Sequence, residues 1–141
     1  MTSAQVFGVV AAIYGASGVA LGAFGAHGLE SRLGAAGLET WRTAVSYHLF
    51  HTLALLAVAV WMRTAGVDGP ARGALALAGW CFVAGVLAFS GSLYALALNA
   101  TAPGGGSSVV RLLGPVTPLG GLAFIAGWLA LAWAALRFPV S

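Results

Sequence analysis

The chain consists of long apolar stretches separated by short groups of polar residues, glycines and prolines. Four stretches reach the ~20 apolar residues that an α-helix needs to cross a hydrocarbon core about 30 Å thick. They are too continuous for transmembrane β-strands, which alternate between apolar and polar positions. The pattern therefore predicts four membrane-spanning helices, at Val6–Ala26, Thr43–Met62, Gly73–Leu98 and Pro115–Leu136.

The connections between these stretches are short. We expect "TAPGGGSSVVR" (residues 101–111) to break the chain between the third and fourth helices, because glycine and proline interrupt helices. Short connections join antiparallel neighbours, so the sequence predicts an all-α membrane protein: a single domain, residues 1–141, with four antiparallel transmembrane helices in a compact bundle. The expected break between the second and third helices comprises Arg63, Asp68, Gly69, Pro70 and Arg72.

Composition supports this class. Hydrophobic residues make up 60% of the chain and charged residues only 6%, whereas soluble domains carry about 25% charged residues. The basic isoelectric point, about 9.8, results from six arginines spread over the helix ends, where such residues anchor at lipid headgroups. We therefore expect the lipid bilayer as the surrounding partner, and no nucleic acid.

Orientation follows only weakly from the arginines. Each end of the predicted bundle has three of them, so the positive-inside rule is tied. Both chain termini are predicted at one end, and the free amino terminus favours the cytoplasmic side for it. We call the opposite end of the bundle the distal end.

The intramembrane polar residues gather toward the distal end in the predicted topology. His48 and His51 share one face of the second helix at 100° per residue, with Tyr47 at its edge. Polar side chains in membrane helices turn toward the bundle interior. We therefore predict a polar intramembrane cluster of His27, Tyr47, His48, His51, Ser92, Tyr94 and Thr117.

The first predicted helix carries a ridge of small residues. Gly18 and Gly22 have the spacing that lets two membrane helices approach closely. The ridge predicts close packing against a second helix and comprises Gly15, Gly18, Gly22 and Gly25.

Catalytic and metal-binding patterns are missing from the sequence. No set of nucleophile, base and acid appears, so we expect that the protein is not an enzyme. The single Cys81 excludes an internal disulfide and a cysteine metal cluster, and no carboxylate lies within a predicted span. We predict no metal site, and the sequence identifies no cofactor.

Four ordered blocks carry a family resemblance: "LGAFGAHGL" (21–29), "WRTAVSYHLFH" (41–51), "FSGSLYALAL" (89–98) and "GPVTPLGGLAFIAGW" (114–128). The chain resembles the family called domain of unknown function 423, which includes small bacterial inner-membrane proteins and their animal relative, transmembrane protein 256. The resemblance implies a multi-pass protein of the bacterial cytoplasmic (inner) membrane and no established activity. The residues that match family motif positions are His27, Tyr47, His48, His51, Gly91, Ser92, Tyr94, Thr117, Pro118, Gly120 and Gly121.

Three functions remain open at this point. The preferred one is a structural or accessory subunit, acting as a homo-oligomer or within a larger membrane complex, with histidines that hydrogen-bond between helices. The second is binding of a small ligand, namely a lipid, a quinone, a metal or haem, at the histidines and tyrosines. The third is transport of protons or small solutes by an oligomer.

Overall fold

The computed structural model describes residues 1–64, 69–99 and 112–137. Its helices form four antiparallel spans, each long and apolar enough to cross a membrane, which confirms the predicted fold class. A capping box of Thr2 and Gln5 begins the first helix. The elements are α1 (Ser3–His27), α2 (Ala35–Thr64), α3 (Gly69–Gly85), the π-helical segment η1 (Val86–Ser90), α4 (Gly91–Asn99) and α6 (Val116–Leu136).

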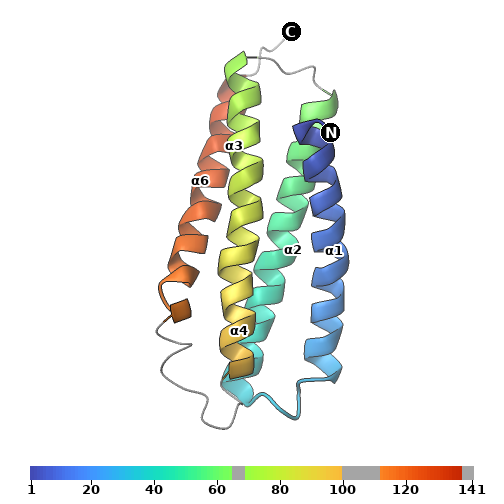
Figure 1. Cartoon of the computed structure of the whole chain (residues 1–141), viewed down its shortest axis with the longest axis vertical. Helices are drawn as coiled ribbons and strands as arrows, with labels where there is room; N and C mark the ends of the chain where they lie inside the picture. Colours follow the sequence, from blue (N-terminus) through green and yellow to red (C-terminus); the bar gives the residue numbers. More distant parts are fainter. Residues whose placement is uncertain (65–68, 100–111, 138–141) are drawn as a thin grey trace.

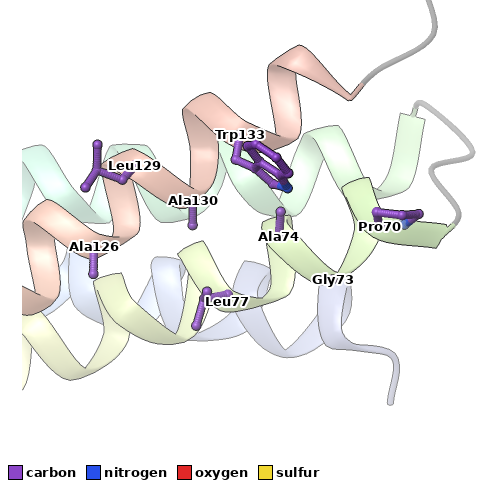
Figure 2. A pocket seen from close by; sticks show the side chains of 8 residues that line it. All are labelled: Pro70, Gly73, Ala74, Leu77, Ala126, Leu129, Ala130 and Trp133. Atoms are coloured by element: carbon purple, nitrogen blue, oxygen red, sulfur yellow. The ribbon is translucent and has the colours of Figure 1, made fainter.

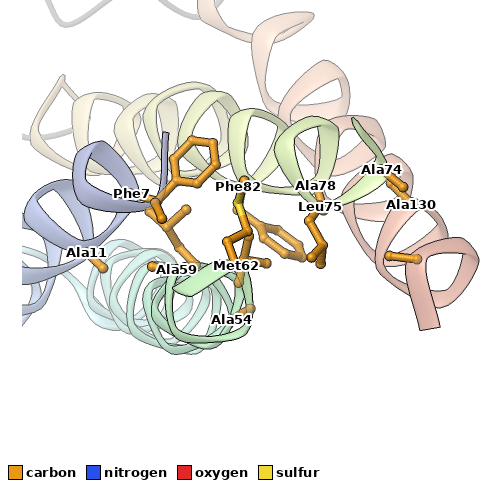
Figure 3. Packing of buried hydrophobic residues seen from close by; sticks show 14 of the residues in the cluster. Phe7, Ala11, Ala54, Ala59, Met62, Ala74, Leu75, Ala78, Phe82 and Ala130 are labelled. Atoms are coloured by element: carbon orange, nitrogen blue, oxygen red, sulfur yellow. The ribbon is translucent and has the colours of Figure 1, made fainter. Parts of the chain in front are cut away.

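The spans form two closely packed pairs, α1 with α2 and α3 with α6. Figure 1 shows the two pairs side by side, with α1 and α6 at the outer edges and α2 next to α3 and α4. The main hydrophobic core fills the space where α1, α2, α3 and α6 meet, and it includes Phe7, Leu55, Leu75 and Phe82. Figure 3 shows Phe7 and Phe82 pointing into this space from α1 and α3.

The α2 helix starts at Ala35 rather than at the predicted Thr43. Its additional turns are less apolar, and they are stabilised by a second core in which Trp41 packs with Leu29, Leu33 and Ala97. The connection after α1 supplies Leu29 and Leu33, so this short loop folds over the distal end. Tertiary burial thus extends the helix beyond the apolar run on which the prediction was based.

The predicted break between the second and third spans is wrong for most of its residues. Arg63 lies within α2, and Gly69, Pro70 and Arg72 lie within α3. Proline is compatible with the first turn of a helix, because backbone N–H groups there have no intrahelical acceptor. Asp68 and the predicted break at 101–111 lie outside the described residues.

The close approach of α3 and α6 depends on glycines facing aromatic rings. Phe124 of α6 lies against Gly85 of α3, and Phe82 of α3 lies against Gly127 of α6. A Cβ atom added at Gly127 would come within 2.7 Å of the Phe82 ring. Each ring therefore occupies the space that a side chain on the opposite helix would need.

Candidate functional site

The two histidines of α2 lie deep within the membrane span. Arg42 and Arg63 are both exposed and lie about 31 Å apart along the helix axis at 1.5 Å per residue. This distance matches a hydrocarbon core of about 30 Å. By the same rise, His51 lies about 2 Å from the midpoint and His48 about 7 Å from it. His51 therefore lies near the middle of the span, and His48 lies closer to its distal end.

His48 belongs to a cluster that links α1, α2 and α4. It is 5% exposed, and its Nδ1 atom lies 3.3 Å from the Tyr94 hydroxyl. The Tyr14 ring meets the imidazole edge-on at 5.4 Å, and the Tyr14 hydroxyl donates a hydrogen bond to the Val83 carbonyl at 3.2 Å. Tyr14 thus connects α1 both to His48 and to the third span.

Two polar atoms near this cluster are buried without a hydrogen-bond partner among the described residues: His48 Nε2 and Ser90 Oγ. Ser90 is fully buried at the end of the π-helical segment. Unpaired buried polar atoms of this kind weaken a structure.

Trp41 closes the same cluster toward the distal end. Its indole N–H donates to the Leu21 carbonyl at 2.9 Å, and its ring packs against Tyr94 with centroids 4.6 Å apart. A Cβ atom at Gly25 would lie 2.5 Å from this ring. The glycine ridge of α1 therefore provides the surface on which Trp41 rests.

All four ridge glycines lie on the side of α1 that faces α2. Added Cβ atoms would meet Thr52, Leu49, Val45 and Trp41 from Gly15, Gly18, Gly22 and Gly25, respectively. The approach is tightest at Gly18 and Gly25 and looser at the other two positions, where the nearest atoms are 3.4 to 3.8 Å away.

His51 belongs to a second cluster, which links α2 to α6. Its ring stacks on Phe124 with centroids 3.5 Å apart and an angle of 12° between planes. Its Nδ1 lies 2.8 Å from the Tyr47 carbonyl, and its Nε2 lies 3.3 Å from the Trp128 indole N–H. A carbonyl only accepts and an indole N–H only donates. These bonds therefore require a neutral imidazole with the proton on Nδ1, and both ring nitrogens are occupied.

A groove opens to the surface beside this second cluster, between α2 and α6. Its volume is about 530 Å³. Tyr47 is 42% exposed at its edge, and its hydroxyl forms no hydrogen bond to a described residue. An unbonded hydroxyl surrounded by hydrocarbon costs roughly 2–7 kcal/mol. The lining residues are Tyr47, His51, Pro118, Gly121, Leu122, Phe124, Ile125 and Trp128.

Ser92 and Thr117 form a third polar link, between α4 and α6. Their hydroxyl oxygens lie 2.7 Å apart, and the Ser92 hydroxyl also donates to the Phe89 carbonyl at 2.9 Å. Gly120 allows this contact, because a Cβ atom there would lie 2.8 Å from the Phe89 Cα. The π-helical segment and α6 thus meet backbone to backbone.

His27 does not join the other predicted site residues. It is exposed at the end of α1. It follows Gly25 by two positions and so points about 200° around the helix from the face that packs on α2. The remaining predicted residues divide among separate contacts: His48 with Tyr94, His51 with Tyr47, and Ser92 with Thr117.

Sequence reasoning missed Tyr14, Phe124 and Trp128 as partners of the histidines. One signal was available for Trp128: it lies in the middle of a predicted span, away from the membrane interface where tryptophan is enriched. A tryptophan N–H in an apolar environment usually has an acceptor. The structure shows that this acceptor is His51 Nε2.

The arrangement offers little for a metal ion. Among residues 1–64, 69–99 and 112–137, no group of three or more His, Cys, Asp or Glu side chains could hold one. His51 has no free nitrogen lone pair, because Nε2 accepts from Trp128. The two histidines of α2 also face different neighbours, which separates them as a ligand pair.

The four spans and their interhelical hydrogen bonds define a small multi-pass membrane protein. A family model described as "Protein of unknown function (DUF423)" matches residues 21–121, and the chain belongs to this family. The match includes the residues of the His48 cluster on α2 and α4 as well as Thr117 and Gly120.

Relatives of similar length occur in bacteria and in yeast. The chain is 39% identical to UPF0382 membrane protein YwdK of Bacillus subtilis, over 95% of this chain and 98% of the relative. It is 40% identical to a UPF0382 membrane protein of Haemophilus influenzae, over 84% of each chain. It is 39% identical to UPF0382 membrane protein C1782.12c of Schizosaccharomyces pombe, over 84% of this chain and 92% of the relative. No solved structure matches the chain.

Proposed function

We propose that the protein is a non-catalytic structural or accessory subunit of a membrane assembly, formed with further copies of itself or with a larger membrane complex. The proposed location is the bacterial cytoplasmic (inner) membrane, with both termini on the cytoplasmic side. The observation that carries the proposal is the bonding of His51: both of its nitrogens are used to hold α2 and α6. A histidine bonded in this way stabilises the bundle and is not free for acid–base chemistry.

The distribution of exposed side chains gives further support. Between α1 and α2 only residues 28–34 leave the helices, and that loop folds back onto the bundle. Large apolar side chains are exposed on every span, including Val19, Phe50, Leu87 and Leu129. A partner within the membrane would therefore recognise helix faces, where association depends on close packing.

Photo-crosslinking in native membranes tests this proposal. The photoreactive residue p-benzoylphenylalanine is placed in turn at Val19, Phe50, Leu87 and Leu129, which are 63–68% exposed on four different elements. If the protein is part of an assembly, we expect a crosslinked product of discrete mass from one or two of these positions. The unmodified chain is the control for background.

Two outcomes contradict the proposal. Monomer alone at all four positions would mean that no protein packs against these faces. Equal, heterogeneous products from all four positions would indicate random encounters in the bilayer.

A further inference from the structure

We propose that the groove between α2 and α6 binds an uncharged carbonyl group on a membrane-soluble molecule with an apolar tail, and that the Tyr47 hydroxyl donates a hydrogen bond to this carbonyl. The inference does not depend on the proposed assembly. It rests on the shape of the groove, on the bonding state of its lining residues and on the depth of Tyr47.

The groove exists because α2 and α6 meet through side chains. Their contact is made by the His51 ring on Phe124 and by the Trp128 indole on His51. The volume of about 530 Å³ falls in the range of ~300–1,000 Å³ that is usual for small-molecule sites. From Pro118 to Trp128 the groove follows α6 for about 15 Å at 1.5 Å per residue.

Among the lining residues, the Tyr47 hydroxyl is the donor that forms no hydrogen bond to residues 1–64, 69–99 or 112–137. The His51 proton goes to the Tyr47 carbonyl, and the Trp128 N–H goes to His51. The other lining residues have apolar side chains or, at Gly121, none. A single donor in an apolar, uncharged lining selects a neutral acceptor such as a carbonyl and favours hydrocarbon for the rest of the ligand.

The depth of Tyr47 makes water an unsuitable partner. The Tyr47 backbone lies about 8 Å along the helix axis inside the level of Arg42, so the groove that Tyr47 lines lies within the hydrocarbon region that the arginines delimit. Polar groups at such depth need a partner within the protein or a ligand. The carbonyl group of a membrane-soluble molecule can reach this level together with its tail.

A second groove, between α3 and α6, provides the contrast. Figure 2 shows its lining of small and apolar side chains, including Ala74, Leu77, Ala130 and Trp133. Trp133 lies near the C-terminal end of α6, where the Arg137 guanidinium lies 4.5 Å above its ring. This groove is larger, about 650 Å³, and has no hydroxyl, so hydrocarbon tails can occupy it without a specific head.

Two kinds of membrane molecule carry the required chemistry: the ester carbonyl of a phospholipid and the ring carbonyl of an isoprenoid quinone. Native mass spectrometry distinguishes them by mass. The full-length protein is purified in mild detergent, stripped of lipid, and titrated separately with dioleoyl phosphatidylcholine and with decylubiquinone.

Two pairs of variants isolate the site. Tyr47→Phe removes the proposed donor and keeps the ring, while Tyr14→Phe removes a hydroxyl outside the groove. Gly121→Leu fills the groove, because an added Cβ would meet only the Phe89 ring at 3.8 Å. Gly73→Leu places the same side chain in the second groove, where an added Cβ meets nothing within 4 Å. Circular dichroism confirms that each variant folds.

We expect a one-to-one adduct with one of the two probes. Its affinity should fall about tenfold in Tyr47→Phe, which is the effect of one hydrogen bond, and more than tenfold in Gly121→Leu. Tyr14→Phe and Gly73→Leu should bind as the unmodified protein does. The probe that binds identifies the carbonyl source.

Three results would overturn the inference: no adduct with either probe, equal affinity in Tyr47→Phe and the unmodified protein, or equal affinity in Gly121→Leu and Gly73→Leu. The last two would indicate lipid bound nonspecifically around the bundle. If Gly121→Leu does not fold, the difference in affinity between Tyr47→Phe and Tyr14→Phe still tests the inference.

Discussion

Replacing His51 by phenylalanine should destabilise the protein through lost hydrogen bonds rather than lost packing. A phenylalanine ring retains a stack on Phe124, which now lies 3.5 Å from the His51 ring. The Trp128 N–H then loses its acceptor at 3.3 Å in a region without water. Trp128 is 49% exposed, at a depth where its surroundings are lipid and not water. Leaving its donor unpaired there costs about 1–3 kcal/mol, so we expect a loss of this size in the free energy of unfolding.

A double-mutant cycle separates the hydrogen bond from other effects. Trp128→Phe removes the donor, and the double variant removes both partners. The coupling energy between the two sites should be about 0.6–2 kcal/mol, the range for polar pairs in membrane bundles. Reversible unfolding in mixed micelles, followed by circular dichroism, measures all four proteins. His27→Phe serves as the control, since His27 is exposed. A coupling energy near zero would refute the reasoning.

Three further predictions concern packing, the third polar link and orientation. Gly18→Leu should lower the free energy of unfolding by about 1–3 kcal/mol, because an added Cβ would lie 2.6 Å from Leu49 Cδ2. Gly8→Leu should leave it unchanged, because an added Cβ there meets nothing within 4 Å, and equal thermal stability of the two variants in detergent would contradict this. Ser92→Ala should lower the free energy of unfolding by about 0.6–2 kcal/mol, because it removes the hydrogen bond to Thr117. Adding Thr117→Ala should lower it no further, and additive losses in the same unfolding assay would argue against a shared bond. A reporter enzyme active only in the cytoplasm should be active when fused to the amino terminus, and activity of an exported-only reporter there would reverse the proposed orientation.

The spans were predictable because their physical cause is local. A run of about 20 apolar residues satisfies its own backbone as a helix in lipid, and no tertiary information is needed to find it. The start of α2 was not predictable in this way. Ala35 to Arg42 is helical because Trp41 is buried against Leu29 and Leu33, residues whose position depends on how the preceding loop folds.

The histidine partners show a similar division. The 100° periodicity correctly put both His48 and His51 on the buried side of α2. It could not show that one ring turns to Tyr94 of α4 and the other to Trp128 of α6. Those contacts depend on which helices flank α2. His27 is exposed because it points about 200° around the helix axis from Gly25, and Gly25 belongs to the ridge that faces α2.

Nitrogen-15 NMR of the histidine side chains tests the central claim most directly, namely that His51 is consumed by bonds between helices. Protein labelled at both imidazole nitrogens is studied in lipid bilayers, and the His51 resonances are assigned by their loss in His51→Phe. The account predicts that His51 is neutral, with a protonated Nδ1 and an unprotonated Nε2 that shifts when the Trp128 indole is removed. A proton on Nε2, or an Nε2 resonance that ignores Trp128→Phe, would contradict the bonding pattern from which the proposed structural role was inferred.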